Sequence, residues 1–194
     1  MSDLQAIQIA KLEKLREAWL PAVTFLFGEP APQAEFGGFE VNQDIAKPEV
    51  VFTSKEQPYH YRLQIPARSF SNDVMLLADV IQEMVRGLYP MGFDTPKSNV
   101  LSEGVAVYGA VTAIKQVFGE ETLESYLQAL EEQAFAYYDA FNYAAIVMTA
   151  DPQAIKKLRA VQPFLPQLSK ADFDSADVEV ERKMKDILLF TFRE

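Results

Sequence analysis

The stretch from residue 71 to residue 118 constrains the fold most strongly, because it predicts two successive helices joined by a short loop with Pro90, Gly92 and Pro96. In the first helix, over about residues 73–89, apolar side chains recur at helical spacing and form one narrow stripe. The stripe consists of Val74, Leu77, Ala78, Ile81, Val85 and Leu88. A polar stripe of Met75, Asp79, Gln82 and Arg86 runs beside it. We therefore expect the apolar stripe to face the core.

Polar residues and a glycine predict where these two helices begin and end. Ser71 or Asn72 is suited to cap the first helix. Ser98 or Asn99 is suited to cap the second, which is expected to end at Gly119.

The remaining helices and strands are predicted from the same kinds of pattern. Helices are expected over residues 4–20, where Pro21 marks the end, and over residues 120–142, 152–161 and 177–192. Strands are expected over residues 22–27, 39–41, 50–54 and 59–65, with a hairpin loop between the last two. This order predicts one α+β domain over residues 1–194, with a small antiparallel or mixed sheet in residues 22–66 and a helical region over residues 72–192.

Charge and residue usage exclude several classes of protein. The formal net charge is −10 and no cluster of Lys or Arg provides a basic surface, so binding to nucleic acid is not expected. The chain has no cysteine, which excludes disulfides, thiolate zinc sites and thiol nucleophiles. No apolar run approaches the roughly 18 residues that cross a bilayer, and the first residues lack the pattern of a signal peptide. We therefore expect a cytoplasmic protein without a membrane partner.

Polar residues of the two central helices are spaced for a functional site. Gln82 and Arg86 are four residues apart on a helix, so their side chains project together. Glu83 lies next to Gln82, and the second helix opens with the sequence LSEGVAVY, which contains Glu103.

The five residues from Gln82 to Arg86, QEMVR, resemble the HExxH motif of zincin-like metallopeptidases, and LSEGVAVY resembles the segment that carries the third zinc ligand in gluzincins. The resemblance covers about residues 59–118 and implies a zincin-like fold, in which an edge strand borders the cleft. It places Gln82 and Arg86 at the positions of the two histidine ligands. It places Glu83 at the position of the catalytic base and Glu103 at that of the third ligand.

The replaced histidines imply that this site has lost its metal. Gln is a poor zinc ligand and Arg is none, because its guanidinium group stays protonated and offers no lone pair. A catalytic zinc needs three protein ligands, so no metal or other cofactor and no catalytic residue is expected. Arg86 is instead expected to bridge Glu83 and Glu103 and to neutralise both carboxylates.

The function that the resemblance implies is that of a pseudoenzyme whose old cleft binds protein or peptide. Asp79, Tyr108 and His60 are the further residues expected to line this cleft. His60 is the only histidine of the chain and lies in an expected strand, where a structural role is commoner than ligation.

Two alternatives remain open. The first is a zinc-dependent hydrolase with a non-standard site around Glu83, Glu103 and His60. The second is an acidic α+β interaction protein unrelated to peptidases, in which Glu83 and Arg86 form a surface pair at i, i+3. Only a peptidase-like fold requires Glu103 to lie beside residues 82–86.

Overall fold

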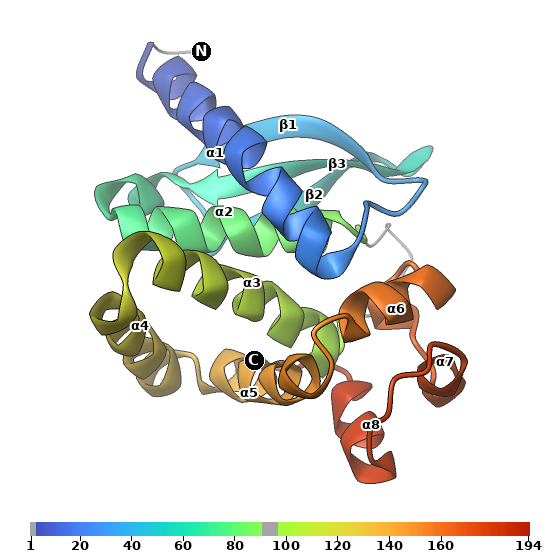
Figure 1. The fold of residues 1–194 in the computed structure, drawn as a ribbon. Coiled ribbons are helices and arrows are strands. Elements are labelled where there is room, and N and C mark those ends of the chain that lie inside the picture. The colour runs from blue at the N-terminus through green and yellow to red at the C-terminus, as the bar shows by residue number, and fades with distance from the viewer. Residues whose placement is uncertain (1–2, 91–96) are drawn as a thin grey trace.

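Figure 1 shows the computed structural model, which describes residues 3–90 and 97–194. Its elements are α1 (Asp3–Phe27), β1 (Glu35–Asn42), β2 (Glu49–Ser54), β3 (Gln57–Pro66), α2 (Asp73–Gly87), α3 (Val100–Phe118), α4 (Glu120–Gln133), α5 (Phe135–Ala150), α6 (Ala154–Val161), α7 (Lys170–Ser175) and α8 (Arg182–Leu188). The chain is therefore α+β, with a small sheet near the N-terminus and a helical C-terminal half, as predicted. Gly92 and Pro96, expected in the loop between α2 and α3, lie outside the described residues.

The sheet has three strands in the order β1-β3-β2, with β1 parallel and β2 antiparallel to the central strand. The predicted hairpin over residues 50–54 and 59–65 is confirmed as β2 and β3. The strand expected at residues 39–41 is part of the longer β1, whose register shifts between Phe36 and Phe39. Within the described part of the chain, β2 is an edge strand that pairs with β3 alone.

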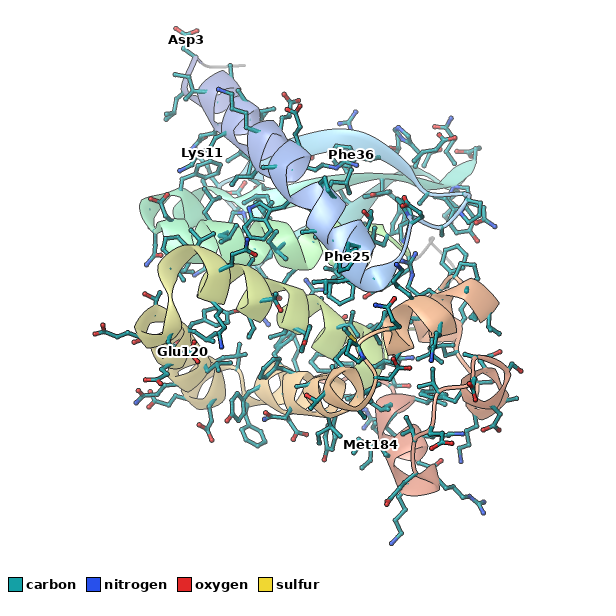
Figure 2. The ribbon with its side chains drawn as sticks, in the orientation of Figure 1. Asp3, Lys11, Phe25, Phe36, Glu120 and Met184 are labelled. Atoms are coloured by element: carbon teal, nitrogen blue, oxygen red, sulfur yellow. The ribbon has the colours of Figure 1, made fainter. Side chains whose placement is uncertain are left out.

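The elements form successive layers, which Figure 1 shows from the sheet downward. α1 and α2 pack on the sheet, α3 packs on α2, and α4 and α5 cover α3. Side chains fill the space between α1 and the sheet, and Phe36 is one of them (Figure 2). The guanidinium carbon of Arg16 lies 4.0 Å from the centre of the Phe36 ring. None of the helices in residues 3–90 and 97–194 has both the length and the apolar character needed to cross a membrane.

α2 forms where its cap and its apolar stripe predict. Asn72 is the cap, and its side-chain oxygen accepts hydrogen bonds from the backbone N–H groups of Val74 and Met75. Every residue of the predicted stripe is buried except Val74, which is half-buried. Leu76, Val80 and Met84 are buried as well, so α2 is enclosed by the sheet on one side and α3 on the other. The side of α2 that carries the polar stripe is therefore the side most exposed to solvent.

α3 begins at the predicted cap and approaches α5 closely. Asn99 caps it and forms a capping box with Ser102, while Gly119 ends it with a φ of +83°. Gly104 lies where the two helices meet. A Cβ atom on this residue would lie 2.1 Å from the carbonyl oxygen of Ala140 in α5, which is backbone and cannot rotate away.

Gly104→Ala is therefore expected to lower the free energy of unfolding by about 2 kcal/mol, since α3 and α5 must separate to admit the methyl group. Gly109→Ala is the matched control on the same helix, because its Cβ would meet only side-chain atoms, the nearest at 3.0 Å. Both substitutions gain the same helix propensity, about 1 kcal/mol. Urea denaturation of the two variants measures the difference, and equal stabilities would contradict the close backbone contact.

The prediction that the first helix ends at Pro21 and gives way to a strand over residues 22–27 is wrong. α1 continues through Pro21 to Phe27. The missing N–H of Pro21 leaves the carbonyl of Glu17 without its helical partner, but both residues are exposed and water can bind that oxygen. Val23 and Phe27 are both buried at helical spacing, so the apolar run of this segment belongs to a helix face rather than to a strand.

The single helix expected over residues 120–142 is two helices, α4 and α5, which separate at Ala134. Ala134 has an extended φ of −147°, although neither proline nor glycine occurs nearby. Both helices pack on α3, so tertiary packing overrides the helix propensity of this stretch. The helix expected from residue 152 is confirmed but begins at Ala154, after a turn in which the Asp151 side chain accepts a hydrogen bond from the N–H of Gln153.

The prediction of a single last helix over residues 177–192 is also wrong. α7 lies before this range and α8 covers only its middle, while Asp177 has a positive φ of 53° that no helix accommodates. Phe173 and Leu188 are fully buried and anchor these two short helices. After α8 the backbone pairs with Ser98 and Val100 instead of continuing as a helix.

Candidate functional site

A cleft of about 670 Å³ lies between the sheet edge and the helical layers. α2 contributes its whole polar stripe, Met75, Asp79, Gln82 and Arg86, together with Glu83. The edge strand β2 contributes Glu49, Val50 and Phe52, and α4 and α5 contribute Tyr126, Leu130 and Tyr137. Glu103 lies in the first turn of α3, and Phe192 and Glu194 come from the segment after α8.

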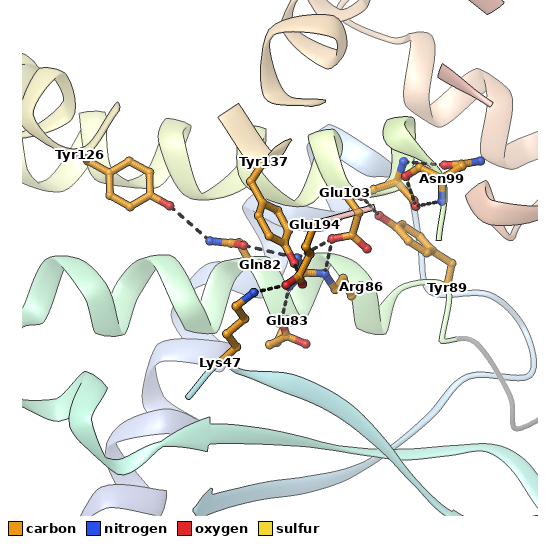
Figure 3. A network of polar contacts seen from close by, with 11 residues as sticks. Lys47, Gln82, Glu83, Arg86, Tyr89, Asn99, Glu103, Tyr126, Tyr137 and Glu194 are labelled. Carbon is orange, nitrogen blue, oxygen red and sulfur yellow. Dashed lines mark hydrogen bonds and ion pairs between the residues drawn. The ribbon is translucent and has the colours of Figure 1, made fainter. Parts of the chain in front are cut away.

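Arg86 bridges Glu83 and Glu103, as the sequence predicts (Figure 3). Its Nη1 donates to Oε1 of Glu83, and its Nε and Nη2 donate to Oε2 of Glu103 at 3.1 and 2.7 Å. Gln82 completes the group, since its Oε1 accepts a longer bond of 3.5 Å from Nη2. The guanidinium group therefore lies between the side chains of Gln82, Glu83 and Glu103.

The alternative of a surface pair between Glu83 and Arg86 is wrong. The Glu83 side chain is 0% exposed, and that of Arg86 is 19% exposed. Figure 3 shows the Glu83 side chain directed from α2 toward the sheet, where it is fully buried, whereas Arg86 is partly exposed in the cleft. Oε2 of Glu83 has no hydrogen-bond partner among the described residues, so only one of its two oxygens is satisfied.

Burial and charge act in opposite directions on these two groups. Burial raises the pKa of Glu83 to about 7, against the attraction of Arg86, and the nearby carboxylate of Glu103 adds to the rise. Burial alone would lower the pKa of Arg86, but Glu83 and Glu103 outweigh it and the pKa is raised. Arg86 is therefore a permanent cation, while Glu83 changes its charge near neutral pH.

Glu83→Gln is expected to gain stability relative to the wild type as the pH rises from 4.5 to 7. Between these values the folded state keeps a proton on Glu83 that the unfolded state, with an ordinary pKa of 4.5, has released. Stability of the wild type therefore falls as the pH rises through this window, whereas glutamine cannot ionise. We expect a relative gain of about 2 kcal/mol above pH 7.

Urea denaturation at pH 4.5 and pH 7.5 measures this gain. Glu40→Gln is the control, because Arg62 and Gln64 lower the pKa of Glu40 and no gain with rising pH follows. A difference between Glu83→Gln and the wild type that does not change with pH would contradict a raised pKa of Glu83.

The polar stripe of α2 continues this network along the cleft. The side-chain amide of Gln82 donates to the hydroxyl of Tyr126 at 3.3 Å, and the hydroxyl of Ser69 donates to Asp79. Burial raises the pKa of Asp79, and the hydrogen bond from Ser69 opposes the rise. On the far side of Arg86, the hydroxyl of Tyr89 donates to the backbone carbonyl of Ser102 at 3.1 Å and ties α3 to the end of α2.

Two residues expected in the cleft lie elsewhere. Tyr61 of β3 packs against Gly87 of α2, and because side chains alternate along a strand, His60 points to the opposite face of the sheet. There it contacts the Thr53 hydroxyl. Tyr108 is five residues after Glu103, more than a third of a turn round α3, and its ring packs on Phe27 instead. Asp79 lines the cleft, as expected.

The sequence did not point to the residues that close the cleft on its other side. The Glu194 carboxylate accepts hydrogen bonds from the side chains of Lys47 and Tyr137, and the Phe192 ring centre lies 4.8 Å from that of Tyr137. Lys47 and Glu194 are 147 positions apart, and neither belongs to a motif. No local pattern in the sequence predicts such a contact.

The residues that the resemblance to zincins aligns with zinc ligands do not fit zinc. Gln82 supplies an amide, Glu103 supplies a carboxylate, and Arg86 supplies a protonated guanidinium group that lies within hydrogen-bond distance of both and of Glu83. Across residues 3–90 and 97–194, no group of three or more His, Cys, Asp and Glu side chains is arranged to hold a metal ion. A metal ion here would need the space and the charge that Arg86 now provides.

Comparison of the chain with protein-family models, with curated proteins and with solved structures gave no match. The residues that line the cleft are therefore the basis on which a function can be assigned.

Proposed function

We propose that the protein is a catalytically inactive, zincin-like domain that binds protein or peptide in the cleft beside α2. The bridge from Arg86 to Glu83 and Glu103 supports this proposal, because the resemblance of the sequence to zincins assigns these three residues to positions of metal ligands and of the catalytic base. A base must be free to accept a proton from the reacting water. Glu83 is instead enclosed by the core and paired with a cation.

The walls of the cleft suit an extended polypeptide. β2 is an edge strand, and strands at an edge bind peptides through their free backbone groups. Apolar and aromatic side chains such as Val50, Leu130 and Tyr137 supply contact area, and Lys47 and Arg68 supply charge. The volume of about 670 Å³ lies within the range of about 300–1,000 Å³ that is typical of ligand sites.

Selection of displayed random peptides on the immobilised protein tests the proposal. Ala129 is exposed and lines the cleft. Ala129→Trp is therefore expected to fill part of the cleft and to lower the affinity for the selected peptides about tenfold or more. Ala160→Trp on α6 is the matched control, because Ala160 is also exposed and does not line the cleft. The proposal fails if no peptide is selected, or if the two tryptophan variants bind the selected peptides equally well.

A further inference from the structure

Two residues of the segment 190–194, Phe192 and Glu194, already line the cleft. The N–H of Phe192 donates to the carbonyl of Ser98 at 2.8 Å, and the N–H of Val100 donates to the carbonyl of Phe190 at 3.0 Å. Thr191 and Asn99 form an antiparallel bridge between these bonds. The segment is thus held by main-chain hydrogen bonds that place few demands on its sequence.

The side chains of Phe192 and Glu194 fix this segment in place, and Figure 3 shows Glu194 beside Lys47 and Tyr137. Phe192 stacks on Tyr137, and two residues later Glu194 turns its carboxylate to the side chains of Lys47 and Tyr137. The Tyr137 hydroxyl donates to the carboxylate at 2.5 Å, and the positive charge of Arg86 also acts on it. These contacts lower the pKa of Glu194, chiefly through Lys47 and Tyr137, so the carboxylate is charged in this position.

We infer that Lys47 and Tyr137 form a subsite for a carboxylate, and that the peptide bound by this cleft carries an acidic side chain two residues after an aromatic one. Residues 190–194 are the internal occupant of the same subsite and compete with that peptide. A cation and a hydroxyl donor that converge on one point bind a carboxylate more strongly than a neutral group. This inference rests on the proposed peptide-binding function.

The charges at this end of the cleft favour an acidic ligand even though the chain as a whole is acidic. Glu83 and Glu103 are already paired with Arg86, so they do not neutralise Lys47. The Lys47 side chain remains 60% exposed and its only ion pair among the described residues is with Glu194. Displacement of Glu194 therefore leaves an accessible cation for the carboxylate of the ligand.

The test uses the full chain with Phe192→Ala and Glu194→Ala, and as probe a labelled, amidated peptide of residues 190–194, FTFRE. Fluorescence polarisation should show that this peptide binds the double variant about tenfold more tightly than the wild type, because the internal occupant has lost both anchors. The peptide FTFRQ should bind the double variant about tenfold more weakly than FTFRE. Adding Lys47→Met to the double variant should abolish the difference between the two peptides.

Equal binding of FTFRE to the wild type and to the double variant would overturn the inference, and so would equal binding of FTFRE and FTFRQ. The single variant Glu194→Gln keeps the shape of the segment. If it also binds FTFRE more tightly than the wild type does, misfolding of the double variant is not the cause of its tighter binding. A second copy of the chain could also supply the segment that occupies the cleft, and sedimentation of the wild type tests this. A wild-type dimer that dissociates when Phe192→Ala and Glu194→Ala are introduced would overturn the inference. The peptides selected above separate the two proposals: if they bind in the cleft without an acidic side chain, this inference fails and the proposed function stands.

Discussion

Replacement of Arg86 by methionine is expected to lower the free energy of unfolding by about 3 kcal/mol at neutral pH, the lower end of the range for breaking a buried ion pair. The substitution leaves Glu83 and Glu103 in the protein without a cation, and both are at least nine-tenths buried. The lower end applies because 19% of the Arg86 side chain is exposed and water screens part of the interaction.

The loss should become smaller as the pH falls, because Arg86 attracts Glu83 only while Glu83 is ionised, and the wild type loses this interaction when Glu83 is protonated. The Glu83 pKa of about 7 with Arg86 present can only rise when the cation is removed. Denaturation with urea at pH 5 and pH 7.5 therefore measures both the size and the origin of the effect. Adding Glu83→Gln to Arg86→Met should recover part of the stability at pH 7.5.

Arg62→Met is the matched control, because Arg62 pairs with Glu40 on the surface of the sheet, where both side chains are more than a third exposed. Exposed pairs contribute about 0–1 kcal/mol. If Arg86→Met and the control lower the free energy of unfolding by amounts within about 0.5 kcal/mol of each other, Arg86 does not act as a structural replacement for a metal ion.

The bridge could be predicted because every residue in it lies on two adjacent helices with clear periodicity. The spacing of Gln82 and Arg86 fixes their shared direction, and the apolar stripe of α2 fixes which side remains for them. Glu103 follows from the cap at Asn99, which sets the start of α3. Short-range rules therefore place these residues on their helices, whereas the contact between Arg86 and Glu103 is expected from the resemblance to zincins.

Other parts depend on contacts that local rules do not describe. Arg159 shows this most clearly, because it is 5% exposed and donates to the backbone carbonyls of Phe27, Gly28, Glu29, Leu88 and Pro163. It joins the ends of α1 and α2 to α6, yet nothing near it in the sequence distinguishes it from a surface arginine. The segment of residues 190–194 is similar, since its pairing with Ser98 and Val100 replaces a helix that its own sequence favours.

Introduction of two histidines on α2 is expected to create a zinc site. Gln82→His together with Arg86→His recreates HEMVH on α2, and histidines at i, i+4 aim both imidazoles at one ion. The third ligand is in place, because Oε2 of Glu103 lies 2.7 Å from Nη2 of Arg86. We expect the double variant to retain one equivalent of zinc after dialysis, measured by elemental analysis, and the wild type to retain none.

Zinc should also stabilise this variant against unfolding, by about 2.7 kcal/mol at a free concentration 100 times the Kd, because it binds the folded state alone. The same concentration should leave the melting temperature of the wild type unchanged. Adding Glu103→Gln is the control that separates a three-ligand site from adventitious binding by two adjacent histidines, and it should weaken zinc binding strongly. If the double variant binds no zinc, or if the variant without Glu103 binds it equally well, the cleft does not have the geometry of a zincin, and its likeness to a peptidase ends at the level of short motifs.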